Sequence, residues 1–128
     1  MKTATYSNEY SPVAPVFPAS IAIPGESPTG NEIALIDTGA DGTFVPTALL
    51  EEMDLPIAYA TNVRSHLGDA LYRVSIHTVD LILFDSIRLP GIEVVADDWG
   101  DRIILGRNVL NLLELYLNGP TRTAGVQE

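Results

Sequence analysis

Cysteine is absent from this sequence of 128 residues, and histidine occurs only twice, at His66 and His77. The lack of thiols excludes a disulfide framework, a thiolate nucleophile and the cysteine-based zinc sites. The two histidines have no ligand-like partners at short spacing, which indicates ordinary hairpin positions without a metal role. Any chemistry in this chain has to come from other side chains.

Basic residues are also scarce, because seven Lys and Arg stand against 17 Asp and Glu and give a net charge of −10. Such a chain repels nucleic-acid phosphates and anionic lipid surfaces, so we expect neither nucleic acid nor membrane as a partner. Long apolar runs are missing too, and residues 1–9 lack the apolar stretch of a signal peptide. We therefore expect a soluble cytoplasmic protein.

Apolar residues are nonetheless plentiful, at 46% of the chain against 19% charged residues. This balance is typical of globular proteins, and the length suits one domain. Residues 1–18 are rich in Ser, Thr and Pro, and Pro12, Pro15 and Pro18 each remove a backbone donor, which predicts an extended N-terminal arm. The domain itself is expected over residues 19–128.

Strand patterns dominate this domain, so the fold class is predicted as all-β, or mainly β with one or two short helices. A Pro at its start and good helix formers predict one helix over residues 46–53, and a second follows Gly106. A long hairpin is expected within residues 57–84, with its polar tip at residues 66–69. The other strands are predicted at residues 21–23, 33–36, 43–45, 87–89, 92–96, 103–105 and 115–117.

Two short motifs carry the chemical information. The first apolar run ends abruptly in a loop that contains two glycines and two carboxylates, Asp37-Thr38-Gly39-Ala40-Asp41-Gly42-Thr43. The second run, residues 103–105, ends in Gly106-Arg107-Asn108. A chance Asp-Thr-Gly is easy to find, whereas the two motifs in this order are not.

Together, these motifs resemble the signatures of retropepsin-like, or retroviral-type, aspartic peptidases over roughly residues 19–118. The resemblance implies a closed acid-protease barrel with one lobe per chain. Pepsin-like relatives carry two Asp-Thr/Ser-Gly loops in a longer chain, but this sequence has one. A homodimer with two copies of Asp37 is therefore implied. It also implies an aspartic endopeptidase in which one Asp37 activates water and its protonated twin polarises the scissile carbonyl, without a metal or cofactor.

The same resemblance assigns supporting roles around Asp37. Thr38 is implied to bond across the dimer, and Gly39 to keep the backbone close to the substrate, with Ala40 next to it. Asp41 and Arg107 match residues that pair as carboxylate and guanidinium beneath the active site, in a bidentate geometry. The remaining implied members of the polar network are Thr43, Gly106 and Asn108.

Substrate is expected to bind as an extended peptide between the active-site loops and two flaps. The flap tip is assigned to His66, Leu67, Gly68 and Asp69, on the polar tip of the long hairpin. Trp99 and Ile104, which precede or lie on the second motif strand, are candidates to line a pocket for the substrate, although Ile104 equally suits a plain core position. The terminal segments, residues 1–18 and 115–126, are expected to build the dimer sheet.

Alternatives remain open at this stage. Asp37 also suits an Asx turn that bonds only its own loop, and Asp41 and Arg107 also suit two exposed charges. The motifs fit a catalytically silent dimerisation or peptide-binding module as well, and the net charge fits a structural acidic β-domain with a basic partner. Asp97, Asp98 and Asp101 lack the spacing of a calcium loop and favour a solvated loop.

Overall fold

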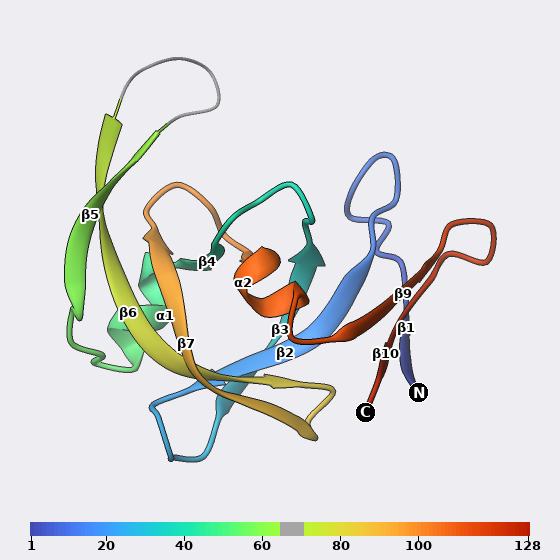
Figure 1. Cartoon of the computed structure of the whole chain (residues 1–128), viewed down its shortest axis with the longest axis horizontal. Coiled ribbons are helices and arrows are strands. Elements are labelled where there is room, and N and C mark those ends of the chain that lie inside the picture. Colours follow the sequence, from blue (N-terminus) through green and yellow to red (C-terminus); the bar gives the residue numbers. More distant parts are fainter. Residues whose placement is uncertain (65–70) are drawn as a thin grey trace.

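The fold is a closed six-stranded barrel with a hairpin extension and a separate small sheet. The structure, a computed structural model, describes residues 1–64 and 71–128. Figure 1 shows the barrel, with the terminal sheet beside it. The elements are β1 (Lys2–Thr5), β2 (Val16–Ala22), β3 (Thr29–Ile36), β4 (Thr43–Pro46), α1 (Thr47–Glu52), β5 (Tyr59–Arg64), β6 (Leu71–Leu83), β7 (Ile87–Asp97), β8 (Ile103–Leu105), α2 (Arg107–Leu110), β9 (Glu114–Asn118) and β10 (Thr123–Gln127).

The barrel closes because β2 pairs with strands on both sides. The pairing order is β2-β3-β8-β4-β7-β6, and β6 returns to β2 with Ala19 opposite Leu83 and Ala22 opposite Asp80. Register shifts in β2 and in β6 mark irregular pairing where these long strands bend. Among the described residues, strand β5 pairs only with β6, so the β5–β6 hairpin extends past the barrel, as Figure 1 shows.

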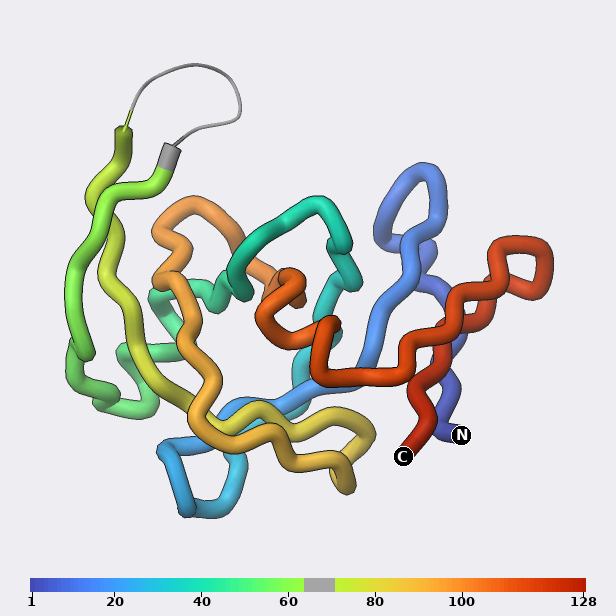
Figure 2. The backbone as a smooth tube through the Cα atoms, in the orientation of Figure 1, coloured from blue at the N-terminus to red at the C-terminus, as the bar shows by residue number. Residues whose placement is uncertain are grey.

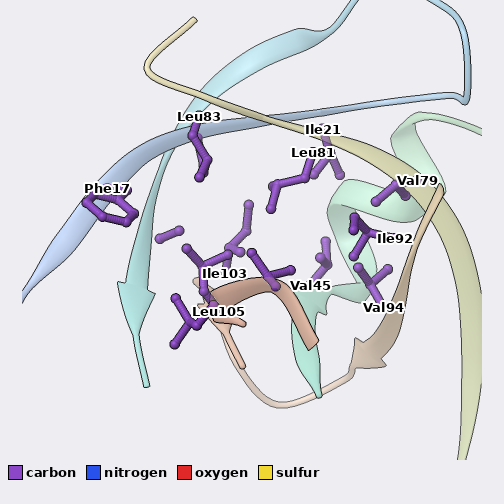
Figure 3. Packing of buried hydrophobic residues seen from close by; sticks show 14 of the residues in the cluster. Phe17, Ile21, Val45, Val79, Leu81, Leu83, Ile92, Val94, Ile103 and Leu105 are labelled. Atoms are coloured by element: carbon purple, nitrogen blue, oxygen red, sulfur yellow. The ribbon is translucent and has the colours of Figure 1, made fainter. Parts of the chain in front are cut away.

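The core lies inside this barrel and is built from alternate apolar residues of nearly every strand. Figure 3 shows side chains from β2, β4, β6, β7 and β8 converging on one another. Phe17, Val45 and Ile103 are fully buried. Burial of each such side chain stabilises the fold by about 1.5–3 kcal/mol.

The N-terminal arm is shorter than predicted, because β2 begins at Val16 and Phe17 is fully buried in the core. Pro18 is tolerated within the strand. Its carbonyl accepts the Phe84 amide at 3.0 Å, just beyond the last β2–β6 pair. The missing N–H of Pro18 therefore points toward the end of that ladder and leaves the pairing with β3 intact.

The two chain ends meet in a three-stranded sheet of order β1-β10-β9. Lys2 lies opposite Val126, and Figure 2 shows the N- and C-termini side by side. The β9–β10 hairpin turns at Asn118, whose side chain accepts the Thr121 amide. The two terminal segments thus pair with each other within one chain.

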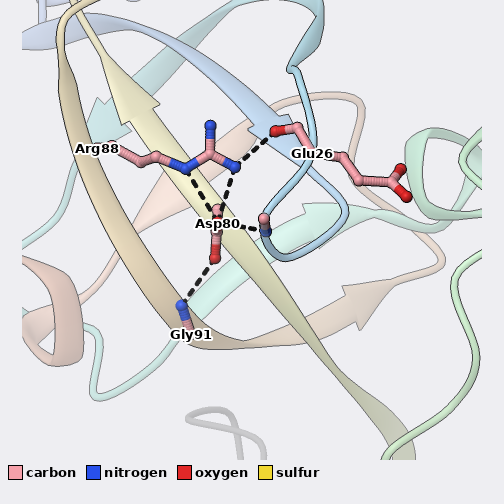
Figure 4. A network of polar contacts seen from close by, with 5 residues as sticks. Glu26, Asp80, Arg88 and Gly91 are labelled. Carbon is pink, nitrogen blue, oxygen red and sulfur yellow. Dashed lines mark hydrogen bonds and ion pairs between the residues drawn. The ribbon is translucent and has the colours of Figure 1, made fainter.

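A buried carboxylate joins the turn between β2 and β3 to strand β7. Asp80, which is 3% exposed, accepts the amides of Gly25 and Gly91 at 2.9 and 3.0 Å and two bonds from the Arg88 guanidinium (Figure 4). Arg88 also donates to the Glu26 carbonyl. These backbone amides, followed by Arg88, hold the pKa of Asp80 below the ordinary carboxyl value of 3.8.

Replacing Asp80 by asparagine should lower the free energy of unfolding at neutral pH by about 2–4 kcal/mol, because one side-chain oxygen becomes an NH₂ group that faces donors. The native pKa is depressed, so this stabilisation is complete above pH 3.8 and is lost as the pH falls through the native value. Urea unfolding of both proteins should therefore show a difference that shrinks below pH 3.8. Asp85→Asn, in the adjacent turn, is the control; a constant difference at all pH values would contradict this account.

The predicted mainly-β architecture with two short helices is confirmed. Neither helix, at six and four residues, has the length needed to cross a bilayer, and the described part of the chain contains no other helix. Strand β2 differs most from its prediction, since it begins at Val16 rather than at residue 21. The prolines at residues 15 and 18 concealed its start, because proline normally marks the end of a strand pattern.

Candidate active site

Asp37 lies directly after β3, where the chain leaves the barrel wall. Its amide donates to the Leu105 carbonyl at 3.0 Å, which joins the ends of the parallel strands β3 and β8. Its carboxylate Oδ1 accepts the Gly39 amide at 2.9 Å. The side chain is half-buried, and a β-carbon at Gly39 would lie 3.2 Å from that oxygen. The loop therefore orients the carboxylate, and Gly39 places backbone without a side chain next to it.

The bond from Gly39 is also the bond that an ordinary Asx turn makes. It does not by itself separate a catalytic aspartate from a turn residue. What distinguishes this loop is the framework that holds it, because residues from β8 and α2 bond to it.

The second motif docks directly onto this loop. The amide of Arg107 donates to the Ala40 carbonyl at 2.9 Å, and the amide of Asn108 donates to the Asp41 carbonyl at 3.2 Å. Gly106 passes so close that an added β-carbon would lie 2.0 Å from the Gly42 carbonyl oxygen. Glycine is therefore required here for space, and the two motifs form one unit.

The Arg107 guanidinium makes two contacts with the loop. Nη1 donates to the Thr38 carbonyl at 2.8 Å, and Nη2 contacts Asp41 Oδ1. The ion pair joins one nitrogen to one oxygen, and the Asp41 side chain is 93% exposed, so the pair lacks the implied bidentate geometry. An exposed pair of this kind contributes only about 0.2–1 kcal/mol. Arg107 acts on the loop chiefly through the Thr38 backbone.

Buried Thr43 joins Gly106 to Asn108, which lies at the surface. The Thr43 hydroxyl donates to Asn108 Oδ1 at 2.8 Å and accepts the Gly106 amide at 3.1 Å. Asn108 in turn donates from Nδ2 to the Glu93 carbonyl. The Glu93 carboxylate accepts a bond from the Tyr59 hydroxyl at the start of β5 and raises the pKa of that phenol. The site framework is thus linked to the β5–β6 hairpin.

Thr43→Val should lower the free energy of unfolding by about 1–3 kcal/mol, because the buried Gly106 amide would lose its acceptor and Asn108 Oδ1 would lose its donor. Urea unfolding measures this loss. Thr29→Val, at an exposed position of β3, is the control and should change stability little. Equal unfolding midpoints for the two variants would contradict the assigned network.

A groove of about 670 Å³ lies between the β5–β6 hairpin and the barrel. Val63, Tyr72 and Val74 line it from the hairpin, where the cross-strand register places them on one face. Phe44, Val95 and Trp99 line it from the barrel side. The groove is therefore largely apolar and aromatic, and its charged lining residues are Arg73, Asp97 and Asp98.

The two pocket candidates from the sequence lie in different places. Trp99 lines the groove and is 92% exposed, whereas Ile104 lies in β8 opposite Leu35 and is not among the described residues that line it. The proposed flap tip, His66, Leu67, Gly68 and Asp69, lies outside the described residues. Phe44 and Tyr72 were missed. The sequence contained a signal for each of them. Phe44 comes directly after the first motif, and Tyr72 alternates with Val74 on one face of a predicted strand.

The loop of Asp97, Asp98 and Asp101 supports its own turn. Asp97 Oδ1 accepts the amides of Trp99 and Gly100, and Asp98 accepts a bond from the Thr47 hydroxyl. Within residues 1–64 and 71–128, no three acidic or imidazole side chains converge as metal ligands would.

Comparison with known proteins gives a family match. The family model described as aspartyl protease matches residues 21–109, which include both motifs and the strands between them. A sequence comparison with curated proteins finds no significant match.

Solved structures show where this barrel occurs. A retropepsin-like aspartic protease from Rickettsia conorii superposes with a TM-score of 0.67 at 9% identity, covering 98% of this chain and 88% of that one. The protease of simian foamy virus (mac) gives 0.55 at 21% identity, with 75% and 91% covered. The retroviral protease-like domain of Ddi1 from Leishmania major gives 0.58 at 14% identity, with 88% and 87% covered. The predicted retropepsin-like fold is confirmed.

Proposed function

The chain belongs to the aspartyl protease family, and from this premise we propose that it is an aspartic endopeptidase whose active site combines Asp37 from two copies of the chain. One observation carries the proposal. The second motif is hydrogen-bonded to the first motif through backbone and side-chain groups of Gly106, Arg107 and Asn108. A turn with no function beyond its own closure has no need of such a frame.

The chemistry follows from two carboxylates placed together. Neighbouring carboxylates cannot both ionise cheaply, so the pair holds one proton, a behaviour established for aspartic proteases in general rather than derived from this chain. The ionised Asp37 takes a proton from a water molecule, which attacks the scissile carbonyl carbon. The protonated twin hydrogen-bonds the carbonyl oxygen and stabilises the charge that develops there.

The substrate proposed for this site is an extended peptide. The groove between the β5–β6 hairpin and the barrel offers an apolar, aromatic lining that suits large apolar side chains. The β5–β6 hairpin would serve as the flap, and its link through Tyr59 and Glu93 to Asn108 ties flap and active-site loop to one frame. Peptides with bulky apolar residues next to the cut bond are therefore the expected substrates.

Dimerisation is proposed through the terminal sheet. Three apolar side chains there are about half exposed and line a cavity of about 530 Å³, namely Met1, Tyr116 and Leu117. Within residues 1–64 and 71–128, the edge strands β1 and β9 of this small sheet pair only with β10, and apolar side chains on such a sheet suit burial against a second copy. Because one chain supplies one Asp37, such a dimer completes the catalytic pair.

The test combines two measurements on the same protein. Sedimentation gives the oligomeric mass, and a mixed peptide library incubated across a range of pH gives the cleavage sites. A dimer that cuts peptides beside large apolar residues supports the proposal. A dimer that binds library peptides but cuts none would instead identify a silent binding module, and a monomer at high concentration would reject the shared site.

A further inference from the structure

His77 lies in β6 at the point where the β5–β6 hairpin leaves the barrel. The pairing of β6 with β7 runs from Leu83 to Ile76, and Ile76 is also the first β6 residue that pairs with β5, opposite Tyr59. His77 is the next residue toward the barrel, and its side chain is buried, with 6% exposed. A buried imidazole therefore occupies the root of the hairpin, although it has no part in the proposed chemistry.

Both ring nitrogens of His77 have hydrogen-bond partners. Nδ1 lies 3.0 Å from the Pro56 carbonyl oxygen, and Nε2 lies 3.2 Å from the Ser75 hydroxyl oxygen. A carbonyl oxygen can only accept a hydrogen bond, so Nδ1 carries the proton, and Nε2 of the neutral ring accepts from Ser75. The ring therefore joins β6 to the segment that leads from α1 into β5.

Few other bonds hold this segment at the root of the hairpin. The Ala58 amide donates to the Ile76 carbonyl at 2.8 Å, and Pro56 has no N–H, so its carbonyl is the one backbone group it can use. The Tyr59–Glu93 bond is exposed to water, which competes with it. The His77–Pro56 bond is part-buried, and such a bond is costly to lose because its groups are not fully solvated when it breaks.

The position of the root controls the groove through the length of the hairpin. Tyr72, which lines the groove, lies five residues beyond His77 along β6. At about 3.3 Å per residue this is about 16 Å, so a tilt of about 10° at the root would move Tyr72 by about 3 Å. The opposite wall, with Phe44 and Trp99, belongs to the barrel side and would not move with the hairpin. Small changes at the root therefore change the width of the groove.

We propose that His77 is a positioning residue that sets the angle of the β5–β6 hairpin, and thereby the width of the groove that binds the peptide. This inference rests on the proposed peptidase function and adds a residue that governs substrate binding. His77 acts through Pro56 and Ser75 and does not line the groove. Its loss therefore weakens peptide binding and leaves the chemical step nearly unchanged.

His77→Phe tests the proposal, because it keeps a ring of similar size and removes both hydrogen bonds. KM for an apolar peptide should rise roughly 5- to 10-fold, as expected for the loss of about one hydrogen bond, with kcat nearly unchanged. The Kd of a labelled peptide, measured by fluorescence anisotropy in the Asp37→Asn protein, should rise by the same factor. Hydrogen exchange of the Ala58 amide should become faster.

Two further variants separate positioning from general stability. His77→Asn places a side-chain NH₂ group where it can still donate to Pro56, and it should restore most of the binding. Leu83→Val, at the far end of β6, removes a buried methylene group and should lower stability with KM unchanged.

An unchanged KM and Kd in His77→Phe, or an equal rise in Leu83→Val, would overturn the role of His77. An Asn variant that binds as weakly as the Phe variant would overturn it as well. Cleavage with wild-type KM in His77→Phe rejects this inference alone. Peptide binding that depends on His77, in a wild-type protein that cuts no peptide, rejects the peptidase function alone.

Discussion

Asp37→Asn should reduce kcat by on the order of 1,000-fold or more, because an amide can neither accept the proton of the attacking water nor share a proton with its twin. The change is nearly isosteric, and the remaining side-chain oxygen can still accept the Gly39 amide. Fold and dimer should therefore persist. Peptide cleavage by purified protein, together with sedimentation and thermal unfolding, separates lost chemistry from lost structure.

Asp54→Asn provides the matched control for this loss. Asp54 follows α1 with a φ of 53°, a conformation that asparagine also adopts readily. It does not line the groove between the β5–β6 hairpin and the barrel. Its replacement removes the same charge and should leave cleavage unchanged. Comparable cleavage by Asp37→Asn and the wild-type protein would remove Asp37 from the mechanism.

Gly106→Ala should destabilise the protein by about 3 kcal/mol or more, or displace the active-site loop. The new β-carbon would meet the Gly42 carbonyl oxygen at 2.0 Å and the Ala40 carbonyl oxygen at 3.0 Å. Both are backbone atoms, and the Arg107–Ala40 bond holds that stretch in place. The loop can yield only by giving up the bonds that orient it, so cleavage should fall with stability.

Gly119→Ala is the control, because a β-carbon there has nothing within 4 Å and the residue lies in the β9–β10 turn. Urea unfolding measures the difference, and amide hydrogen exchange across residues 37–43 reports on the loop. A Gly106→Ala protein with wild-type stability and loop protection would show that the close approach of the two motifs is wrong.

The part of the site that could be predicted from sequence is the part coded by contiguous residues. An apolar strand followed by Asp37-Thr38-Gly39, and a second followed by Gly106-Arg107-Asn108, each have a local pattern that backbone geometry explains. Their meeting in space was implied by resemblance, and the bonds to Ala40 and Asp41 show it.

The remaining features depend on contacts between distant segments, which a single sequence does not reveal. The alternation of Tyr72 and Val74 predicts a strand face, yet the partner of that face, Phe44 and Trp99, comes from elsewhere in the fold. The path of the loop leaves the Asp41 side chain exposed to solvent, and composition cannot indicate this exposure. The sequence does contain a signal for Asp80, since a carboxylate between Val79 and Leu81 interrupts an apolar run. Its four donor groups, however, come from two other segments, the turn at Gly25 and strand β7.

The central claim is that two chains share one catalytic pair, and subunit mixing tests it most directly. Wild-type and Asp37→Asn proteins are refolded together in varied proportions, and the cleavage rate is measured at constant total protein. If both copies of Asp37 are needed, only wild-type dimers act, so an equal mixture should retain about one quarter of the activity. Retention of about one half, with a linear dependence on the wild-type fraction, would show that each chain works alone and would contradict the account.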